Sequence, residues 1–278
     1  MNSMNNRRGG TIWLWLAAML LVAGSAWASD EMPGRSRYPT VKWVELEQLQ
    51  AMRPNVIIVD TRSRYEYDTL HIKDAVNVVL GEKGFVEGIK ALRTGSQHPI
   101  VFYCNGRTCM KSYQAALEVQ NSGIVNVYAY DAGIFDWVKA YPADSVLLGR
   151  SPVDTAALIG KDKLQAHTLS PAEFEKRIGD NSLILDVRDQ FQREAITLFP
   201  MRQRSVPLDN KALQKYVEQA RQEGKTLLIY DEAGQQVRWL QYYLESEKVA
   251  AYYFLAGGAK GYFEIMMGDM VGRSATAQ

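Results

Sequence analysis

The most informative stretch of this sequence is residues 99–112, which read Pro99-Ile-Val-Phe-Tyr-Cys104-Asn-Gly-Arg-Thr-Cys109-Met-Lys-Ser112. Its β-branched and aromatic run predicts a strand over Ile100–Tyr103, and the apolar periodicity that follows predicts a helix over Met110–Asn121. A short loop containing glycine joins the two. This order of strand, loop and helix is typical of α/β sheets, in which ligands bind at the carboxyl ends of the strands.

Cys104 stands at this strand end and is the candidate nucleophile. Free backbone N–H groups at the helix start and the positive end of the helix dipole favour its thiolate, which is the reactive form of cysteine. The second cysteine, Cys109, follows five residues later. Two cysteines in an exported chain usually indicate one structural disulfide, but so short a loop gains little stability from closure. The setting therefore favours a reactive Cys104 over a structural pair.

The chain begins with the features of a secretory signal peptide over residues 1–28. Arg7-Arg8 forms a basic region, residues 11–22 are apolar, and Ala26-Trp-Ala28 offers a small-x-small cleavage signal before Ser29. We therefore expect export into a bacterial periplasm. The apolar core is short for a membrane span, so no stable membrane anchor is expected, and a retained, uncleaved segment is the alternative.

The charge balance argues against a nucleic-acid partner. Removing the two arginines of the signal segment from the 32 Lys and Arg leaves 30 basic against 31 acidic residues, with no basic tract. The three histidines are scattered and show no metal-ligand spacing, so neither a metal nor another cofactor is expected. The 278 residues, less the signal segment, suit two domains of ordinary size.

Three motifs of this chain occur twice, at offsets of 126, 127 and 125 residues. A nearly constant offset across separated motifs indicates duplication of a whole domain. The matching stretches are Asn55–Arg62 with Ser182–Arg188, Ile100–Cys104 with Leu227–Asp231, and Tyr128–Trp137 with Tyr253–Tyr262.

Both copies alternate short apolar strands with amphipathic helices. This pattern predicts an α/β fold with two domains, each a doubly wound, mostly parallel sheet with helices on both faces. We place the domains at residues 29–142 and 168–278, around a linker at residues 143–167 that lacks a strong strand and is broken by glycine and proline. The other predicted elements of the first copy are strands over Val56–Val59, Ala75–Val78 and Val125–Tyr130, and helices over Val44–Met52, Glu82–Leu92 and Ile134–Ala140.

With these motifs in order, the chain resembles a tandem rhodanese, a family of sulfurtransferases. The resemblance covers nearly all of the chain after the signal segment, and it rests on the order and spacing of motifs that would each be weak alone. In the first copy these are Asp60-Thr-Arg62, Glu66-Tyr67, His71-Ile-Lys-Asp-Ala75-Val-Asn77, the Cys104 loop, Gly133-Ile-Phe-Asp-Trp137 and Tyr141-Pro142.

The resemblance implies that Cys104 accepts a sulfane sulfur from a small anionic donor such as thiosulfate and becomes a persulfide. The sulfur then passes to a thiol, cyanide or protein acceptor. Successive N–H groups of the loop would form an anion-binding nest around the sulfur. The implied substrate contacts are the loop residues Asn105, Gly106, Arg107, Thr108 and Cys109, with Lys111 just beyond. Supporting hydrogen bonds and ion pairs are implied for Asp60, Arg62, Glu66 and His71.

The loop departs from the family's common pattern at its sixth position, where Cys109 stands in place of a basic residue. We expect Arg107, inside the loop, to be the main cationic contact, while Lys111 is as readily a solvated helix residue. Cys109 has two interpretations of equal weight. It is either a partner that makes Cys104 redox-sensitive or a small residue that supports the helix start.

The second copy carries Asp231 where the first has Cys104, and Glu232 follows it. A carboxylate cannot carry a persulfide, and two acids at the loop repel an anionic donor. This copy also has no counterpart of His71. We therefore expect a catalytically silent domain that packs on the first one and shapes its cleft.

Other functions fit the sequence less well than sulfur transfer. A phosphatase of related fold needs an arginine where Met110 stands, so the ligand that clamps a phosphoryl group is missing. A non-turnover sulfur-binding or redox-sensing module would use Cys104 and Cys109 as a dithiol–disulfide pair. A scaffold with two inert domains is disfavoured by the intact cysteine loop. Sulfur transfer is the prediction, and the redox module is its alternative.

Overall fold

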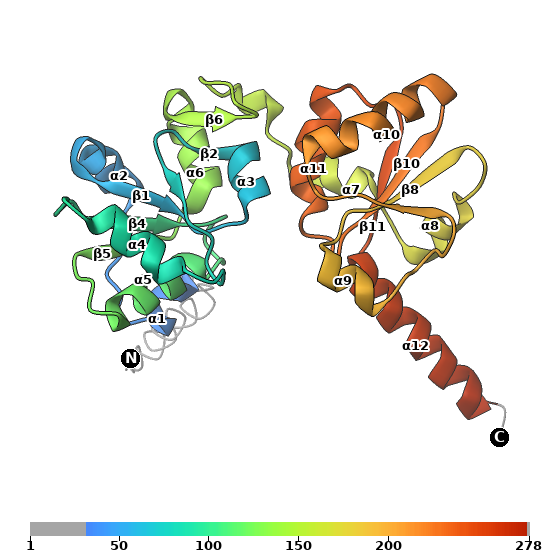
Figure 1. Ribbon diagram of the computed structural model, residues 1–278, viewed down its shortest axis with the longest axis horizontal. Helices are drawn as coiled ribbons and strands as arrows, with labels where there is room; N and C mark the ends of the chain where they lie inside the picture. The colour runs from blue at the N-terminus through green and yellow to red at the C-terminus, as the bar shows by residue number, and fades with distance from the viewer. Residues whose placement is uncertain (1–31, 277–278) are drawn as a thin grey trace, which may run out of the picture.

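The structure, a computed structural model, describes residues 32–276 and shows two α/β units (Figure 1). The predicted signal peptide and its cleavage site lie outside the described residues. Among the residues described, no helix is both long and apolar enough to cross a membrane. Each unit is built around its own sheet, and the two sheets share no strand.

The first unit has a parallel sheet of four strands in the order β3-β1-β4-β5. The register places Asp60, Tyr103 and Tyr130 side by side at the carboxyl ends of three neighbouring strands. The residues that follow these three therefore emerge at one edge of the sheet. The strands are β1 (Ile57–Asp60), β3 (Val76–Asn77), β4 (Ile100–Tyr103) and β5 (Val127–Tyr130).

Helices cover both faces of this sheet, as Figure 1 shows. One core packs α2 and α6 against the sheet around the buried side chains of Leu49 and Trp137. The other packs α4 and α5 on the opposite face, around Phe85 and Val119. The helices of this unit are α1 (Pro33–Arg37), α2 (Leu46–Met52), α3 (Arg64–Thr69), α4 (Phe85–Arg93), α5 (Lys111–Asn121) and α6 (Gly133–Ala140), with a 3₁₀ turn at Arg53–Asn55.

The second unit repeats this plan with a five-stranded sheet in the order β7-β11-β10-β8-β9. Its helices α10 and α11 cover one face, and α8 and α12 cover the other. The strands are β7 (Thr168–Leu169), β8 (Ser182–Asp186), β9 (Gln203–Ser205), β10 (Thr226–Tyr230) and β11 (Tyr252–Leu255). The helices are α8 (Pro171–Lys176), α9 (Gln190–Ala195), α10 (Asn210–Glu223), α11 (Val237–Ser246) and α12 (Gly258–Thr276).

The predicted fold class is confirmed, and so is the strand over Ile100–Tyr103. Some helix starts differ because backbone geometry sets them. The helix predicted from Glu82 begins at Phe85, after Gly84 adopts a left-handed conformation with φ +93° as its N-cap. The short helix α3 was not predicted, although Ser63 and Glu66 form a capping box that starts it.

The connector, predicted to lack a strong strand, contains a short one. This strand is β6 (Ser145–Leu147), and it pairs antiparallel with β2 (Leu70–Ile72) of the first unit. A three-residue strand leaves little periodicity in the sequence, so only the pairing partner reveals it. The connector also contains 3₁₀ turns at Pro142–Asp144 and Thr155–Ala157 and the helix α7 (Lys161–Ala166).

The two units meet along α11, which packs against α3. Trp239 of α11 is 2% exposed, and its ring stacks on Phe135 of α6 with a centroid distance of 5.5 Å. Tyr65 of α3 donates a hydrogen bond of 2.8 Å to Asn210. Trp239 thus belongs to the hydrophobic core of the first unit as well as to its own helix.

Candidate active site

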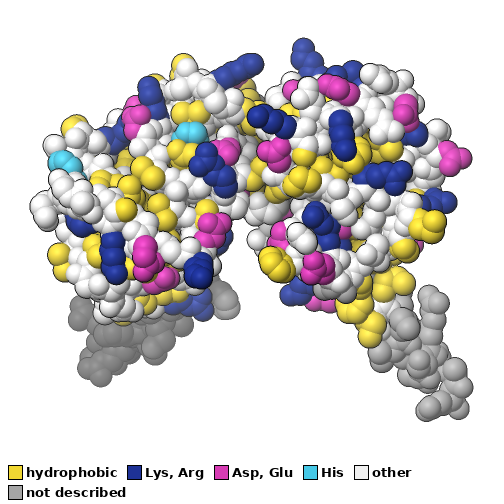
Figure 2. Space-filling view, viewed as in Figure 1, with side chains coloured by type: hydrophobic (Ala, Val, Ile, Leu, Met, Phe, Trp, Pro, Cys, Tyr) yellow, Lys and Arg dark blue, Asp and Glu magenta, His cyan; other side chains and the backbone are white. Residues whose placement is uncertain are grey.

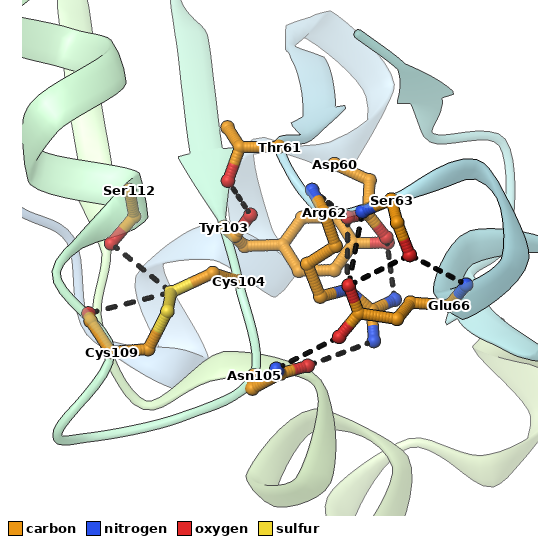
Figure 3. The surroundings of a disulfide bond; sticks show 10 residues. All are labelled: Asp60, Thr61, Arg62, Ser63, Glu66, Tyr103, Cys104, Asn105, Cys109 and Ser112. Atoms are coloured by element: carbon orange, nitrogen blue, oxygen red, sulfur yellow. Dashed lines mark hydrogen bonds and ion pairs between the residues drawn. A yellow bond between two sulfur atoms is a disulfide. The ribbon is translucent and has the colours of Figure 1, made fainter. Parts of the chain in front are cut away.

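Cys104 directly follows β4 and is fully buried. Its sulfur is bonded to that of Cys109, with a Cα–Cα distance of 6.4 Å (Figure 3). The Cys104 Sγ lies 3.9 Å from Ser112 Oγ, which belongs to the first turn of α5. The sulfur therefore sits at the start of the helix, as the sequence predicted. In this state neither sulfur is a thiolate, and a reductant must open the disulfide before Cys104 acts as a nucleophile.

A glycine at the start of α6 sets the position of the cysteine loop. Gly133 begins α6 with φ +72°, a conformation that other residues rarely adopt. A Cβ at this position would lie 2.4–2.6 Å from backbone atoms of Asn105 and Gly106. Its neighbour Ile134 donates a backbone hydrogen bond of 3.0 Å to the carbonyl of Cys104. The start of α6 therefore packs directly on the cysteine loop.

Asn105, the residue after the cysteine, is held between two charged side chains (Figure 3). Its Nδ2 donates to Glu66 Oε1 at 3.0 Å, and its Oδ1 accepts from Arg62 Nη1 at 3.2 Å. The amide thus uses both its donor and its acceptor on groups outside the loop. This arrangement fixes the direction in which the loop leaves β4.

The two charged groups that hold Asn105 are themselves fixed. Arg62 is fully buried and makes a bidentate ion pair with Asp60, at 2.9 and 2.6 Å. Burial alone would raise the pKa of Glu66, but the charge of Arg62 and hydrogen bonds from Asn105 and Ser63 outweigh it, so that pKa lies below its usual value. Glu66 is therefore a carboxylate at neutral pH. Asp60, Arg62 and Glu66 form the supporting network that the sequence suggested.

The other predicted site residues are exposed or contact other parts of the first unit. Arg107 is directed to α6, where its guanidinium pairs with Asp136 at 2.9 Å. Lys111 and Thr108 are exposed. His71 donates a 2.7 Å hydrogen bond from Nδ1 to the carbonyl of Tyr67, and its imidazole stacks on the Tyr67 ring. Burial lowers the pKa of this imidazole. These contacts tie His71 to α3 rather than to the cysteine loop.

Asp131 follows β5 at this edge of the sheet. It was not among the site residues predicted from the sequence. It is 1% exposed and accepts hydrogen bonds from Tyr113 at 2.6 Å and from Arg35 at 2.8 Å. Its place after a predicted strand could have identified it, because β5 ends beside β4, the strand that Cys104 follows. Asp131 links α1 and α5 to the turn that precedes Gly133.

The corresponding loop of the second unit is filled by its own carboxylate. Asp231 is 3% exposed and accepts hydrogen bonds from the backbone N–H groups of Gly234, Gln236 and Val237, the last at 3.1 Å. These N–H groups form the nest that an anion would otherwise occupy. Glu232 takes the place of Asn105, with its carboxylate 3.6 Å from the guanidinium of Arg188. A cavity of about 670 Å³ lies beside this loop.

Comparison with known proteins places both units in one family. The model of the rhodanese-like domain matches residues 43–140 and 170–264, which together make up more than half of the chain. Curated relatives include a tRNA uridine(34) hydroxylase of Bdellovibrio bacteriovorus, 28% identical over 101 residues, and one of Photorhabdus laumondii, 27% identical over 106 residues. The matches cover 36% of this chain in both cases, and only 28% and 29% of the two relatives.

Solved structures with a similar arrangement include a thiosulfate sulfurtransferase from Pseudomonas aeruginosa. It shares 20% sequence identity, with a TM-score of 0.37, over 84% of this chain and 47% of that chain. A rhodanese-related protein from Thermoplasma volcanium shares 17% identity, with a TM-score of 0.30, over 36% of this chain and 92% of that chain.

Proposed function

Because this chain belongs to the rhodanese-like family, with two copies of the domain, we propose that it is a sulfurtransferase whose chemistry is carried by Cys104 alone. The donor is a small anion with a sulfane sulfur, such as thiosulfate. The acceptor is a thiol, cyanide or a protein. The observation that supports this proposal best is the position of Cys104 between the carboxyl end of β4 and the first turn of α5.

The reaction needs two displacements at sulfur. After a dithiol reduces the Cys104–Cys109 disulfide, the Cys104 thiolate attacks the outer sulfur of thiosulfate, the S–S bond of the donor breaks, and sulfite leaves with the electron pair. The acceptor then attacks the terminal sulfur of the Cys104 persulfide, and the cysteine thiolate leaves. Backbone N–H groups of the loop and the dipole of α5 stabilise the negative sulfur in both steps.

The second unit serves as a non-catalytic partner of the first. Asp231 cannot form a persulfide, and its carboxylate already accepts the N–H groups of its own loop. We place the active unit at residues 29–142, the linker at 143–167 and the inactive unit at 168–278. We also propose export to the periplasm after cleavage between Ala28 and Ser29, which N-terminal sequencing of the mature protein would test.

Intact-mass spectrometry tests the activity most directly. The reduced protein is incubated with thiosulfate, and peptide mapping then locates any added sulfur. We expect one sulfur atom on Cys104, none in the Cys104→Ser variant, and thiocyanate formation when cyanide is added. Substantial turnover by Cys104→Ser would contradict the proposal.

The disulfide itself supports a second candidate function, a thiol redox module. Cys104 and Cys109 are bonded in the structure, so the two residues that would form a dithiol–disulfide couple lie within bonding distance. Such a module would cycle between the two states and produce no thiocyanate after reduction. Thiocyanate formation by the reduced wild-type protein distinguishes the two functions, because the module would form none. If the protein turns over, its activity and that of Cys109→Ser are compared after mild oxidation, with and without reductant. Reversible loss in wild type alone then assigns a switch to Cys109.

A further inference from the structure

The cysteine loop has few cations available for an anionic donor. Arg62 is buried against Asp60, and the carboxylate of Glu66 adds a negative charge behind Asn105. Arg107 is already paired with Asp136. Lys111, the first residue of α5, is exposed to solvent, which screens its charge. Thiosulfate carries two negative charges, so a less exposed cation would strengthen its binding.

Arg238 supplies an additional cation from the second unit. It is the second residue of α11, and its guanidinium lies over the ring of Phe135 in α6, 4.3 Å from the centroid. The side chain is half-buried and makes no ion pair or hydrogen bond with any residue from 32 to 276 that the structure describes. Burial lowers its pKa, but an arginine remains charged at neutral pH. The carboxylate of Glu66 interacts with this guanidinium electrostatically without forming an ion pair, so Arg238 stands beside the network that holds Asn105.

Several contacts place this part of α11 against the groups that support the Cys104 loop. Phe135 directly follows Ile134, whose N–H donates to the carbonyl of Cys104. On the other side, Ser63 Oγ donates a 2.9 Å hydrogen bond to Glu66 Oε2 and lies 3.3 Å from Gln236 Oε1. Arg238 thus lies between two elements, α3 and α6, that both contact the loop.

Figure 1 shows α11 on the side of the second unit that faces α3 and α6. Figure 2 shows a hollow between the lower parts of the two lobes, while charged side chains of both signs are interspersed over the visible surface. No broad basic surface is visible on this face.

We propose that Arg238 is a specificity-determining residue of the Cys104 site and binds the anionic sulfur donor where the two units meet. This inference rests on the proposed sulfurtransferase function. It also gives the silent unit a chemical role, because the unit that lost its nucleophile contributes a cation to the site of the other. A guanidinium suits this role because it offers several N–H donors to the oxygens of a sulfonate-like group.

Alkylation of the reduced protein tests the proposal without requiring sulfur transfer. In a Cys109→Ser background, the rate at which Cys104 reacts with iodoacetate, an anion, is divided by its rate with neutral iodoacetamide. The two reagents are similar in size, so access to the buried sulfur cancels in the ratio. We expect Arg238→Gln to lower this ratio by about tenfold, the loss of one charge-assisted contact, and Arg238→Lys to retain most of it.

A matched control is Arg221→Gln, which removes an exposed arginine on α10 that pairs with Glu247; its ratio should equal that of wild type. Arg238→Met, which keeps an aliphatic stem against Phe135, replaces the glutamine variant if that variant unfolds at a lower temperature. A wild-type ratio of iodoacetate to iodoacetamide rates in Arg238→Gln and Arg238→Met would overturn the proposal. An equal fall of this ratio in Arg238→Lys and Arg238→Gln would overturn it as well.

Steady-state kinetics then separates this inference from the proposed function. We expect Arg238→Gln to raise the KM for thiosulfate about tenfold while kcat changes little. A wild-type protein that forms no persulfide would contradict sulfur transfer, and the alkylation ratio would still decide whether Arg238 attracts anions. A wild-type protein that turns over thiosulfate with a KM unaffected by Arg238→Gln would contradict the role of Arg238 alone.

Discussion

Asn105 connects the chemistry of the loop to the buried charges behind it. Its amide donates to Glu66 and accepts from Arg62, so both ends of the side chain have an assigned partner. A carboxylate at this position would be repelled by Glu66, and an apolar side chain would leave both charged groups without their contact. In the second unit Glu232 stands here and faces only the guanidinium of Arg188.

The first prediction at this scale is that Asn105→Ala lowers the free energy of unfolding by about 1–3 kcal/mol, because two charged groups lose a buried hydrogen-bond partner. Persulfide formation should slow as the loop loses its anchor. Urea unfolding measures the change in stability, and rapid-quench mass spectrometry measures the rate of persulfide formation. Gln114→Ala, at an exposed position of α5, is the control. If Asn105→Ala forms the persulfide at the wild-type rate, the hydrogen bonds of Asn105 do not contribute to the reaction.

Glu66 gives the protein a predictable response to acid. Its pKa is below its usual value when the protein is folded, whereas an unfolded glutamate titrates near about 4.3. Its contribution to stability is therefore complete above about pH 4.3 and is lost as the pH falls through the folded pKa. We expect wild type to lose more stability than Glu66→Gln between about pH 5 and about pH 3.

Urea unfolding across this pH range measures the difference, with Glu118→Gln, at an exposed position of α5, as the control. Parallel pH profiles for wild type and Glu66→Gln would mean that the charge of Glu66 contributes nothing to folding.

Asp231 is predicted to act on stability and not on turnover. Its carboxylate accepts the N–H groups of Gly234, Gln236 and Val237. Asp231→Asn keeps an acceptor oxygen but removes the charge, so we expect a loss of about 1–3 kcal/mol in the free energy of unfolding. Thiosulfate turnover by Cys104 should stay close to that of wild type. Complete loss of turnover in a folded variant would show that the second loop takes part in the chemistry.

At the scale of elements, the Cys104 loop and the Asp231 loop each pack against the start of the helix that follows the next strand. Gly133 in α6 and Gly258 in α12 both have positive φ, and a Cβ at either position would lie within 2.4–2.7 Å of backbone atoms of the adjacent loop. The two glycines thus have the same structural role in an active and in a silent unit. This equivalence provides a matched pair of substitutions.

We expect Gly133→Ala to displace the cysteine loop and to reduce turnover at least about tenfold, with a loss of stability of more than about 1 kcal/mol. Gly258→Ala should lower stability by a similar amount and leave turnover largely intact, because only the silent loop moves. Turnover and thermal unfolding of both variants are compared with wild type. Equal activity of the two variants would refute the coupling between α6 and the cysteine loop.

At the scale of the whole molecule, the two units are joined by a hydrophobic contact as well as by the connector. Trp239 packs against Phe135, and the guanidinium of Arg62 lies 5.0 Å from the centre of its ring. The same tryptophan therefore contacts both the first turn of α6 and the network that anchors Asn105. We therefore expect loss of this contact to affect the unit that carries Cys104, although Trp239 belongs to the unit that carries Asp231.

Trp239→Ala is expected to lower the free energy of unfolding by about 3–5 kcal/mol, as for other buried aromatic truncations. The preference of Cys104 for the anionic reagent should fall as well. The reason is that the stacking of Trp239 on Phe135 docks α11 on α6 and so places Arg238 over Phe135. Chemical unfolding and the iodoacetate-to-iodoacetamide ratio measure these effects. Tyr216→Ala, on α10 away from Phe135, is the control for the ratio. An unchanged ratio after Trp239→Ala would mean that docking of the units does not tune the site.

The sequence by itself determined the duplication, the α/β class, the strand that ends at Cys104 and the replacement of that cysteine by Asp231. These properties follow from local periodicity and from the chemistry of single residues, which a linear chain displays directly. The supporting roles of Asp60 and Arg62 were implied by the resemblance to the rhodanese family, and the structure shows the two side chains paired.

Only the tertiary structure decided which groups meet. Three contacts join residues far apart along the chain. They are the ion pair of Arg107 with Asp136, the strand pair β2–β6 and the stacking of Arg238 on Phe135. No local pattern encodes such contacts, because they depend on how helices pack across a sheet and on how one unit docks against another. The cations available to Cys104 are therefore a property of the folded pair of units, set by packing between elements that the sequence presents separately.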